Sequence, residues 1–233
     1  MNKNTVLKYL AEFALVFVSV IAAFLFDSAR ERRQLKEREL LLLRDVTTDL
    51  GNDTIQYNMR INQAKELKKE LTDLIVTLES NNASQKVEAS TFFKPIEIVL
   101  NKTTFETIKS TGGFEFVADK ELVKGFSEYY NSRAYISEIM SRIITDIDGK
   151  IADMLIQKTR FTENKNPLNS YLIFSHTIDQ KSLNTLIGNQ VLINLLYMKR
   201  TFLDQLITVF SNVSKPNCKR LNAQCNIYLS GKL

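Results

Sequence analysis

The sequence predicts an all-α protein in which an N-terminal transmembrane helix continues into a long helical stalk and then into an antiparallel helical bundle. Three observations lead to this prediction. The chain of 233 residues contains only seven Gly and three Pro, which is typical of helical proteins rather than of many-turned β-sandwiches. An almost uncharged run opens the chain. Behind it, apolar residues recur every seven positions, as in helices packed side by side.

These patterns divide the chain into four parts. We predict a transmembrane helix over 5–27, a long helical stalk over 28–80, a helical bundle domain over 86–213 and an irregular C-terminal tail over 214–233. A hydrophobic content of 44% is sufficient for a folded core. The net charge of +5 is spread along the chain rather than gathered into one stripe, so we expect no nucleic acid partner.

The opening helix is predicted from the eighteen residues Tyr9 to Phe26, in which Glu12 is the only charged side chain. A helix needs about 20 mostly apolar residues to cross a bilayer, with about 17 as the lower limit. A removed export signal is the alternative, but bulky Phe24 and Phe26 stand where its cleavage site needs small residues. Membrane lipid is therefore an expected partner, and the expected location is the bacterial inner membrane, crossed once.

Glu12 and Lys8 are the candidate membrane or pore residues. A carboxylate inside a membrane helix is costly and often functional, so Glu12 could line a pore if several copies faced inward. The alternative, which we favour, places Glu12 near the interface and pairs it with Lys8 one helical turn earlier.

A basic cluster follows the predicted span. RNA binding is one interpretation, but basic residues just past a span commonly touch anionic lipid. The residues expected to contact lipid headgroups are Arg30, Arg32, Arg33 and Lys36. Because Lys and Arg concentrate on the cytoplasmic side of membrane proteins, the cluster favours a cytoplasmic C-terminal domain. Acidic residues are interleaved with it, and the opposite orientation stays open.

The stalk is predicted from a seven-residue apolar repeat. The residues expected to form either a bundle seam or a seam between identical chains are Leu43, Leu50, Tyr57, Ala64, Leu71 and Leu78. Gly51 lies in the polar stretch DLGNDT, which could kink or break the helix. The stretch ESNNASQ, residues 79–85, is expected to end it with a loop. A continuous helix from the membrane would be on the order of 100 Å long.

Shorter elements and two further long helices are expected next. Pro95 fits the first turn of a short helix, and Gly112 fits the position just past the end of another. The stretch FEFV is expected to be extended, and Asp119 is expected to cap a long helix.

A final helix over 189–210 is apolar over a broad face and is expected to be central to the core. After Pro216 the chain is expected to be irregular. Helices with these periods pack most readily as an antiparallel bundle.

Three segments carry a further resemblance: AEFALVFVSVIAAFLFDSARERR, LLLLRDVTTDLGNDT and TFETIKSTGGFEFVADKELVKGFSEYYN. Together they resemble a family of uncharacterised single-pass membrane proteins common in Bacteroidota. The resemblance covers roughly the first 135 residues, and its most specific part lies between Thr107 and Asn131. Family membership implies a membrane anchor and a helical domain, and it implies no activity or catalytic residue.

The chain offers few residues for catalysis. It contains no phosphate-binding loop, nucleophile elbow or zinc-protease motif. Its one histidine, His176, has no supporting motif, and we expect it to be structural. Asp146 and Asp148 are two residues apart, so on a helix they point to different faces and are expected to be solvated. We therefore expect no enzyme, no cofactor and no catalytic residue.

Cys218 and Cys225 are the only two cysteines. They could close a small disulfide loop in an oxidising compartment or stay as free thiols in the cytosol. A zinc site needs about four ligands, so no metal site is expected.

These features favour a non-enzymatic, homo-oligomeric membrane assembly, such as a channel, pore or scaffold subunit, held together by the span and the repeat-bearing stalk. Two alternatives stay open. One is a membrane-tethered sensor that binds a ligand or protein partner in a polar pocket between helices. The other is a membrane-permeabilising effector of a bacterial defence system.

Overall fold

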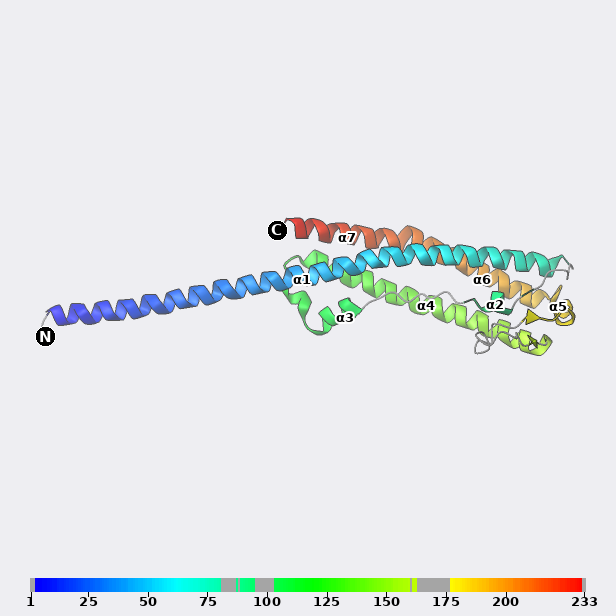
Figure 1. Cartoon of the computed structure of the whole chain (residues 1–233), viewed down its shortest axis with the longest axis horizontal. Coiled ribbons are helices and arrows are strands. Elements are labelled where there is room, and N and C mark those ends of the chain that lie inside the picture. Colours follow the sequence, from blue (N-terminus) through cyan, green and yellow to red (C-terminus); the bar gives the residue numbers. More distant parts are fainter. Residues whose placement is uncertain are drawn as a thin grey trace.

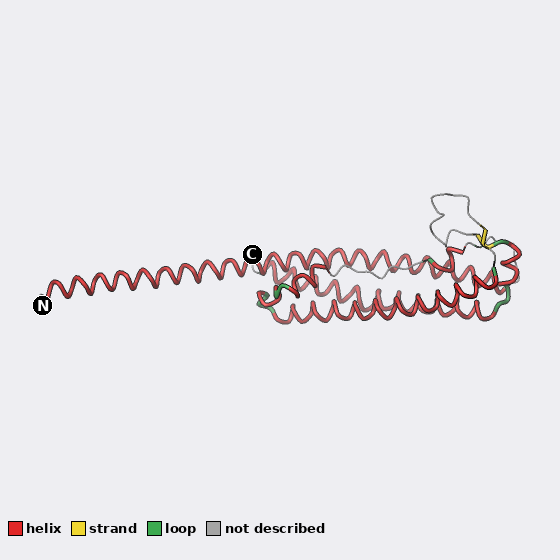
Figure 2. Tube along the Cα trace, turned by 90° about the horizontal axis from the view of Figure 1, so that it is seen from below, coloured by secondary structure: helices red, strands yellow, loops and turns green. Residues whose placement is uncertain are grey.

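The structure, a computed structural model, describes residues 3–80, 87, 89–94, 103–159, 161–162 and 177–231. Within these residues the chain is helical apart from turns and one short antiparallel pair of strands, which confirms the all-α prediction. Figures 1 and 2 show an elongated molecule in which one long helix extends far beyond a bundle that surrounds its other half.

The long helix is α1, which runs without interruption from Lys3 to Glu79. Its 77 residues correspond to about 115 Å at a rise of ~1.5 Å per residue. Gly51 does not break it. A glycine costs about 1 kcal/mol in a helix interior, but the neighbouring side chains of Leu50 and Asp53 are buried among other helices, which holds this turn in place.

The remaining elements lie between α1 and the C-terminus. In chain order they are α2 (Ala89–Phe93), α3 (Thr103–Ser110), the 3₁₀ turn η1 (Gly113–Phe116), α4 (Lys120–Lys158), β1 (Phe161–Thr162), β2 (Thr177–Ile178), α5 (Gln180–Leu186), α6 (Gln190–Val209), the π-helical segment η3 (Phe210–Ser214) and α7 (Lys215–Ser230).

Three long rods form the bundle: the second half of α1, α4, and the run from α6 through η3 to α7. The last of these runs antiparallel to α1 and packs along it, and α4 packs on α6 and α7. The C-terminal end of α7 therefore lies beside the middle of α1, at the end of the bundle that faces the exposed part of α1 (Figure 1).

The predicted seven-residue repeat forms a seam inside one chain. All six side chains are at most 1% exposed: Leu43, Leu50, Tyr57, Ala64, Leu71 and Leu78. Because they contact other helices of the same chain, they cannot also form a seam between copies. The division into a stalk over 28–80 and a bundle over 86–213 is corrected accordingly: α1 belongs to the bundle from Glu39, its first buried side chain in the described sequence.

The irregular tail predicted over 214–233 is also wrong, because α7 occupies most of it. Pro216 lies in the first turn of α7, where a missing N–H is tolerated. The buried residues of this helix recur at spacings of three and four and pack toward α1: Cys218, Leu221, Cys225 and Leu229.

The turn residues predicted before α4 are confirmed. Gly112 adopts a left-handed φ of 68° just past α3, and the carboxylate of Asp119 accepts hydrogen bonds from the N–H groups of Glu121 and Leu122. The extended stretch predicted for FEFV is wrong for its first three residues, which lie in the 3₁₀ turn η1, and only Val117 is extended. Pro95 and most of the loop predicted over 79–85 lie outside the described residues.

Candidate functional site

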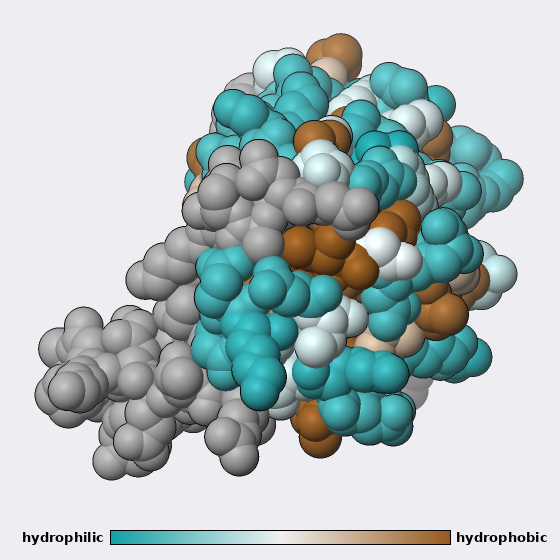
Figure 3. Space-filling model, turned by 90° about the vertical axis from the view of Figure 1, so that its right-hand side faces the viewer, coloured by the Kyte–Doolittle hydropathy of each residue, from teal (hydrophilic) through white to brown (hydrophobic). Residues whose placement is uncertain are grey.

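The exposed part of α1 is the first feature with functional meaning. Its apolar side chains project on all sides, and the rings of Phe13, Phe17, Phe24 and Phe26 are 71%, 58%, 72% and 77% exposed. By length and composition, α1 is a helix that could cross a membrane. The far end of the bundle, by contrast, presents a mainly hydrophilic surface (Figure 3). A continuous apolar surface like that of the exposed part of α1 marks a contact with lipid or with protein.

The charged residues predicted to flank this helix are placed as follows. Glu12 is exposed at the outer edge of the apolar run, and the side chain of Lys8 lies outside the described structure. The headgroup candidates project into solvent within about 15 Å of Phe26 along the helix axis; they are Arg30, Arg32, Arg33 and Lys36.

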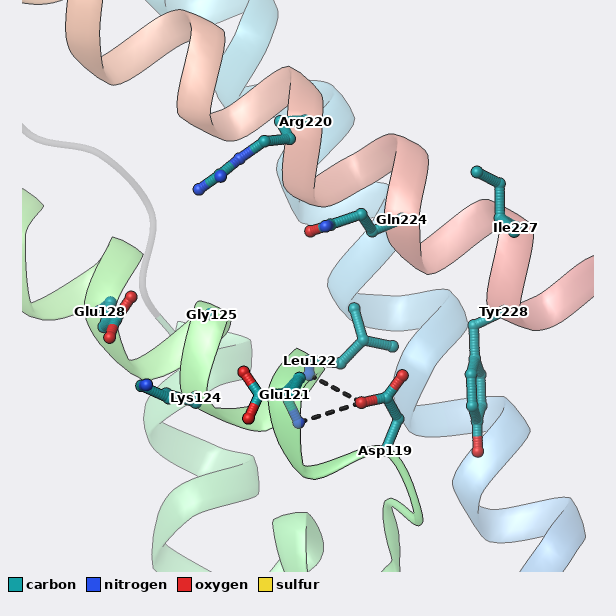
Figure 4. Close-up of a pocket in the computed structure, with 10 residues that line it drawn as sticks. All are labelled: Asp119, Glu121, Leu122, Lys124, Gly125, Glu128, Arg220, Gln224, Ile227 and Tyr228. Carbon is teal, nitrogen blue, oxygen red and sulfur yellow. Dashed lines mark hydrogen bonds between the residues drawn. The ribbon is translucent and has the colours of Figure 1, made fainter.

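A groove between α4 and α7 is the second feature. It has a volume of about 430 Å³, which is within the usual range of binding clefts. Figure 4 shows its side chains. We call it the α4–α7 groove, and its lining consists of Asp119, Glu121, Leu122, Lys124, Gly125, Glu128, Arg220, Gln224, Ile227 and Tyr228.

The groove follows from a close approach of the two helices at a glycine. A methyl group placed on Gly125 would lie 2.9 Å from Cδ1 of Leu221, so the side chain of Leu221 on α7 packs against the backbone of α4 where a side chain is missing. The larger side chains that neighbour Gly125 and Leu221 on α4 and α7 form the walls of the groove. A second hollow of about 250 Å³ adjoins the groove and reaches down to Tyr129.

Both walls of the groove carry charged side chains. Glu121, Lys124 and Glu128 stand on α4, while Arg220 and the neutral amide of Gln224 extend from α7 into the space between the helices (Figure 4). Neither Glu128 nor Arg220 makes an ion pair or a hydrogen bond with its side chain in the described part of the chain. The groove therefore offers a partner both hydrogen-bond acceptors, such as Glu128, and donors, such as Arg220.

Behind the groove, a buried polar network joins α4 to α1. Arg133 contacts both carboxylate oxygens of Asp53, and the hydroxyl of Tyr129 donates to the same carboxylate at 3.1 Å. The guanidinium lies 4.9 Å and 5.1 Å from the ring centroids of Tyr129 and Tyr130. Burial raises the pKa of Asp53, an effect that Arg133 opposes. The network fixes α4 against α1 at the level of the second hollow.

A second buried pair joins α4 to α6. The Lys199 ammonium is 1% exposed and donates to Asp148 at 2.6 Å and to the carbonyl of Phe92 at 2.7 Å. Burial lowers the pKa of Lys199 and raises that of Asp148. The prediction that Asp148 is solvated is therefore wrong. Asp146 is largely solvated as expected, and pairs with Lys150 on the surface.

The two cysteines are free thiols buried on α7. Thr47 donates to Cys225 at 2.9 Å, and Cys218 contacts the carbonyl of Leu50 at 3.2 Å. Seven residues of helix separate the thiols by about 10 Å, which is too far for a disulfide. Burial raises the pKa of both. The question left open by the sequence is answered in favour of reduced thiols.

No cluster of three or more His, Cys, Asp or Glu that could hold a metal ion occurs in the described ranges. His176 lies outside them. A polar pocket between helices was expected only under the sensor alternative, and the residues that line the groove were not predicted, because they depend on how two helices approach each other. Arg133 and Lys199 did leave a signal: each interrupts an otherwise apolar helix face, where a cation needs a buried partner.

These features define a class of protein: an all-α rod in which one helix of a bundle continues as a bare apolar helix, with a charged groove along two other helices. No family model matches the chain, and comparisons with curated proteins and with solved structures give no significant match.

Proposed function

We propose that this protein is a non-enzymatic, membrane-tethered interaction module. The exposed apolar part of α1 anchors it in a bilayer, and the rigid bundle holds the α4–α7 groove above the membrane surface for a partner. The observation that supports this proposal is the groove itself, because Glu128 and Arg220 in its walls make no side-chain ion pair or hydrogen bond within the described part of the chain. It is the polar pocket between helices that a tethered binding module requires.

The continuous helix sets the height of the groove. Tyr228, at its lower end, donates a hydrogen bond to Glu39, thirteen residues beyond Phe26. Cys218, near the upper end of the second hollow, contacts Leu50 and Thr54. At ~1.5 Å per residue the groove lies about 20–40 Å beyond the apolar run. A partner must therefore reach this height, which favours a protein over a lipid headgroup.

The hypothesis of an assembly held together by the seven-residue repeat loses its main support, because the side chains of that repeat are buried against other helices of the same chain. A homo-oligomer must use another surface. The cytoplasmic side of a bacterial inner membrane remains our proposal for the location. The basic residues that follow the apolar run support it, as do the two reduced thiols.

Site-specific photo-crosslinking in membranes tests the groove. A photo-reactive residue replaces Gln224 in the groove, and a matched chain carries it at Met198, which is 56% exposed on α6 outside the groove. We expect a discrete cross-linked product from position 224 and none from position 198. Equal products at both positions, or none at either, would overturn the proposal.

A further inference from the structure

We propose that the partner of the α4–α7 groove is the same groove on a second copy of the chain. This inference rests on the proposed membrane tether. Copies anchored in one bilayer with the same orientation can pair about a twofold axis along the membrane normal. Such an axis leaves every residue at its own height and turns the groove by half a turn. It therefore sets α4 of one copy opposite α7 of the other.

The register between α4 and α7 determines which residues then meet. The Cδ1 atom of Leu221 lies 2.9 Å from the place of a Cβ on Gly125, so the two residues lie at similar heights. Moving away from the membrane, Glu128 follows Gly125 by three residues and Arg220 follows Leu221 by one, since α7 runs in the opposite direction. Glu128 and Arg220 thus lie within about 3 Å of a common height, and Glu128 of one copy faces Arg220 of the second copy.

The same register matches apolar residues above the charged pair. Tyr135 follows Gly125 by ten residues, and Val213 precedes Leu221 by eight, which again differ by about 3 Å in height. Both side chains are open to solvent in one chain, with 66% and 49% of their surface exposed. In the pair, Tyr135 faces Val213 of the second copy. The contacts across the axis therefore join opposite charges at one height and apolar side chains at another.

The contacts are made twice, as a twofold axis requires. Each exposed ion pair stabilises only weakly, and the apolar contact is small. However, anchoring in one bilayer raises the effective concentration of one groove near the other, so a weak interface is sufficient. Lipid anchoring and groove pairing therefore act together, and we expect no stable pair when the apolar part of α1 is removed from the bilayer.

Charge reversal in two differently tagged chains tests this pairing. Glu128→Arg places Arg opposite Arg220 in pairs with itself, and Arg220→Glu places Glu opposite Glu128. Each variant alone should lose cross-linking from position 224 by on the order of tenfold relative to the unchanged chain. Mixed in one membrane, the two variants restore both ion pairs, so cross-linking between the two tags should return to the original yield. Lys219→Glu, on α7 outside the groove lining, is the matched control and should change nothing.

The mixing step distinguishes pairing between chains from an effect within one chain. Each variant alone contains only like charges at positions 128 and 220, so opposite charges can meet only between two different chains. Equal cross-linking in mixed and unmixed membranes overturns the inference, as does the absence of a product of twice the chain mass. A product at position 224 that contains a different protein overturns the inference but supports the tethered interaction module. Chains that fail to enter vesicles contradict the tether and the pairing together.

Discussion

Arg133 shows what a single buried charge does in this bundle. Its side chain is 5% exposed and contacts Asp53, whose side chain is 2% exposed. Removing one member of such a pair leaves an uncompensated buried charge, which costs about 3–5 kcal/mol. We expect Arg133→Met to lower the free energy of unfolding by this amount in denaturant titrations of the full chain in mild detergent.

An exposed ion pair on the same helix provides the control. Arg142 and Glu138 are 77% and 68% exposed, and such pairs stabilise by at most about 1 kcal/mol. Arg142→Met should therefore change the free energy of unfolding little. Combining Arg133→Met with Asp53→Leu should recover much of the loss, because no buried charge remains. Equal losses for Arg133→Met and Arg142→Met would contradict the buried network.

The buried tyrosines near this network lead us to expect that the free energy of unfolding falls at alkaline pH. Burial is the largest cause that raises the pKa of Tyr57, Tyr129 and Tyr130 above the ordinary value of 10.0. These phenols stay protonated in the folded chain and release protons at about pH 10 once it unfolds, so the unfolded state binds fewer protons above that pH. Their stabilising contribution is therefore complete below pH ~10 and is lost as pH rises further.

The measurement is the free energy of unfolding as a function of pH, with tyrosinate absorbance recorded in parallel. We expect the slope above pH ~10 to become shallower in Tyr129→Phe. A slope that is insensitive to Tyr129→Phe would show that this phenol ionises in the folded state.

At the residue scale, the sequence predicted the residues that cap helices better than it predicted the ion-pair partners of buried charges. Asp119 and Gly112 were identified because capping depends on neighbours a few positions away. The partners of Arg133 and Lys199 are 80 and 51 residues distant in sequence. No local spacing contains that information.

At the scale of the helices, the packing of α4 against α7 involves Gly125 but not Gly149. Both lie inside α4, where Gly→Ala stabilises a helix by about 0.5–1 kcal/mol when space is free. Nothing lies within 4 Å of a Cβ at Gly149, whereas one at Gly125 would meet Leu221 at 2.9 Å. We expect Gly149→Ala to raise the free energy of unfolding and Gly125→Ala to lower it.

Thermal or chemical unfolding of the two variants side by side measures this difference. The gap should be at least about 1 kcal/mol, since the first variant gains helix propensity without strain and the second must displace a packed side chain. If both variants were stabilised equally, α4 and α7 would not approach as closely as described.

The seven-residue repeat predicted α1 well, because all its members face one seam. The repeat could not say whether that seam lies within one chain or between copies, since both bury the same stripe. The C-terminal helix was missed for another reason. Pro216 suggested an end of regular structure, but η3 carries the backbone from α6 into α7 without a break.

For the whole molecule, α4 carries one member of each of the two buried ion pairs found among the described residues, with opposite signs. Arg133 meets Asp53 on α1, and Asp148 meets Lys199 on α6. A shift of α4 along the bundle would separate both pairs at once, so the pairs favour a single register. A unique register keeps the walls of the α4–α7 groove opposite each other.

The central claim is that lipid surrounds the first part of α1 while the same helix continues into the bundle. Spin labels on single introduced cysteines test it in vesicles, and the buried native thiols remain unlabelled in the folded chain. Four labels cover all sides of the apolar run, and a fifth follows it: Leu15, Phe17, Val20, Leu25 and Lys36. The account predicts that the first four contact lipid-dissolved oxygen equally and that the label at Lys36 contacts a water-soluble reagent. Labels in the apolar run that are shielded on one side by protein, or that are all reached from water, would contradict it.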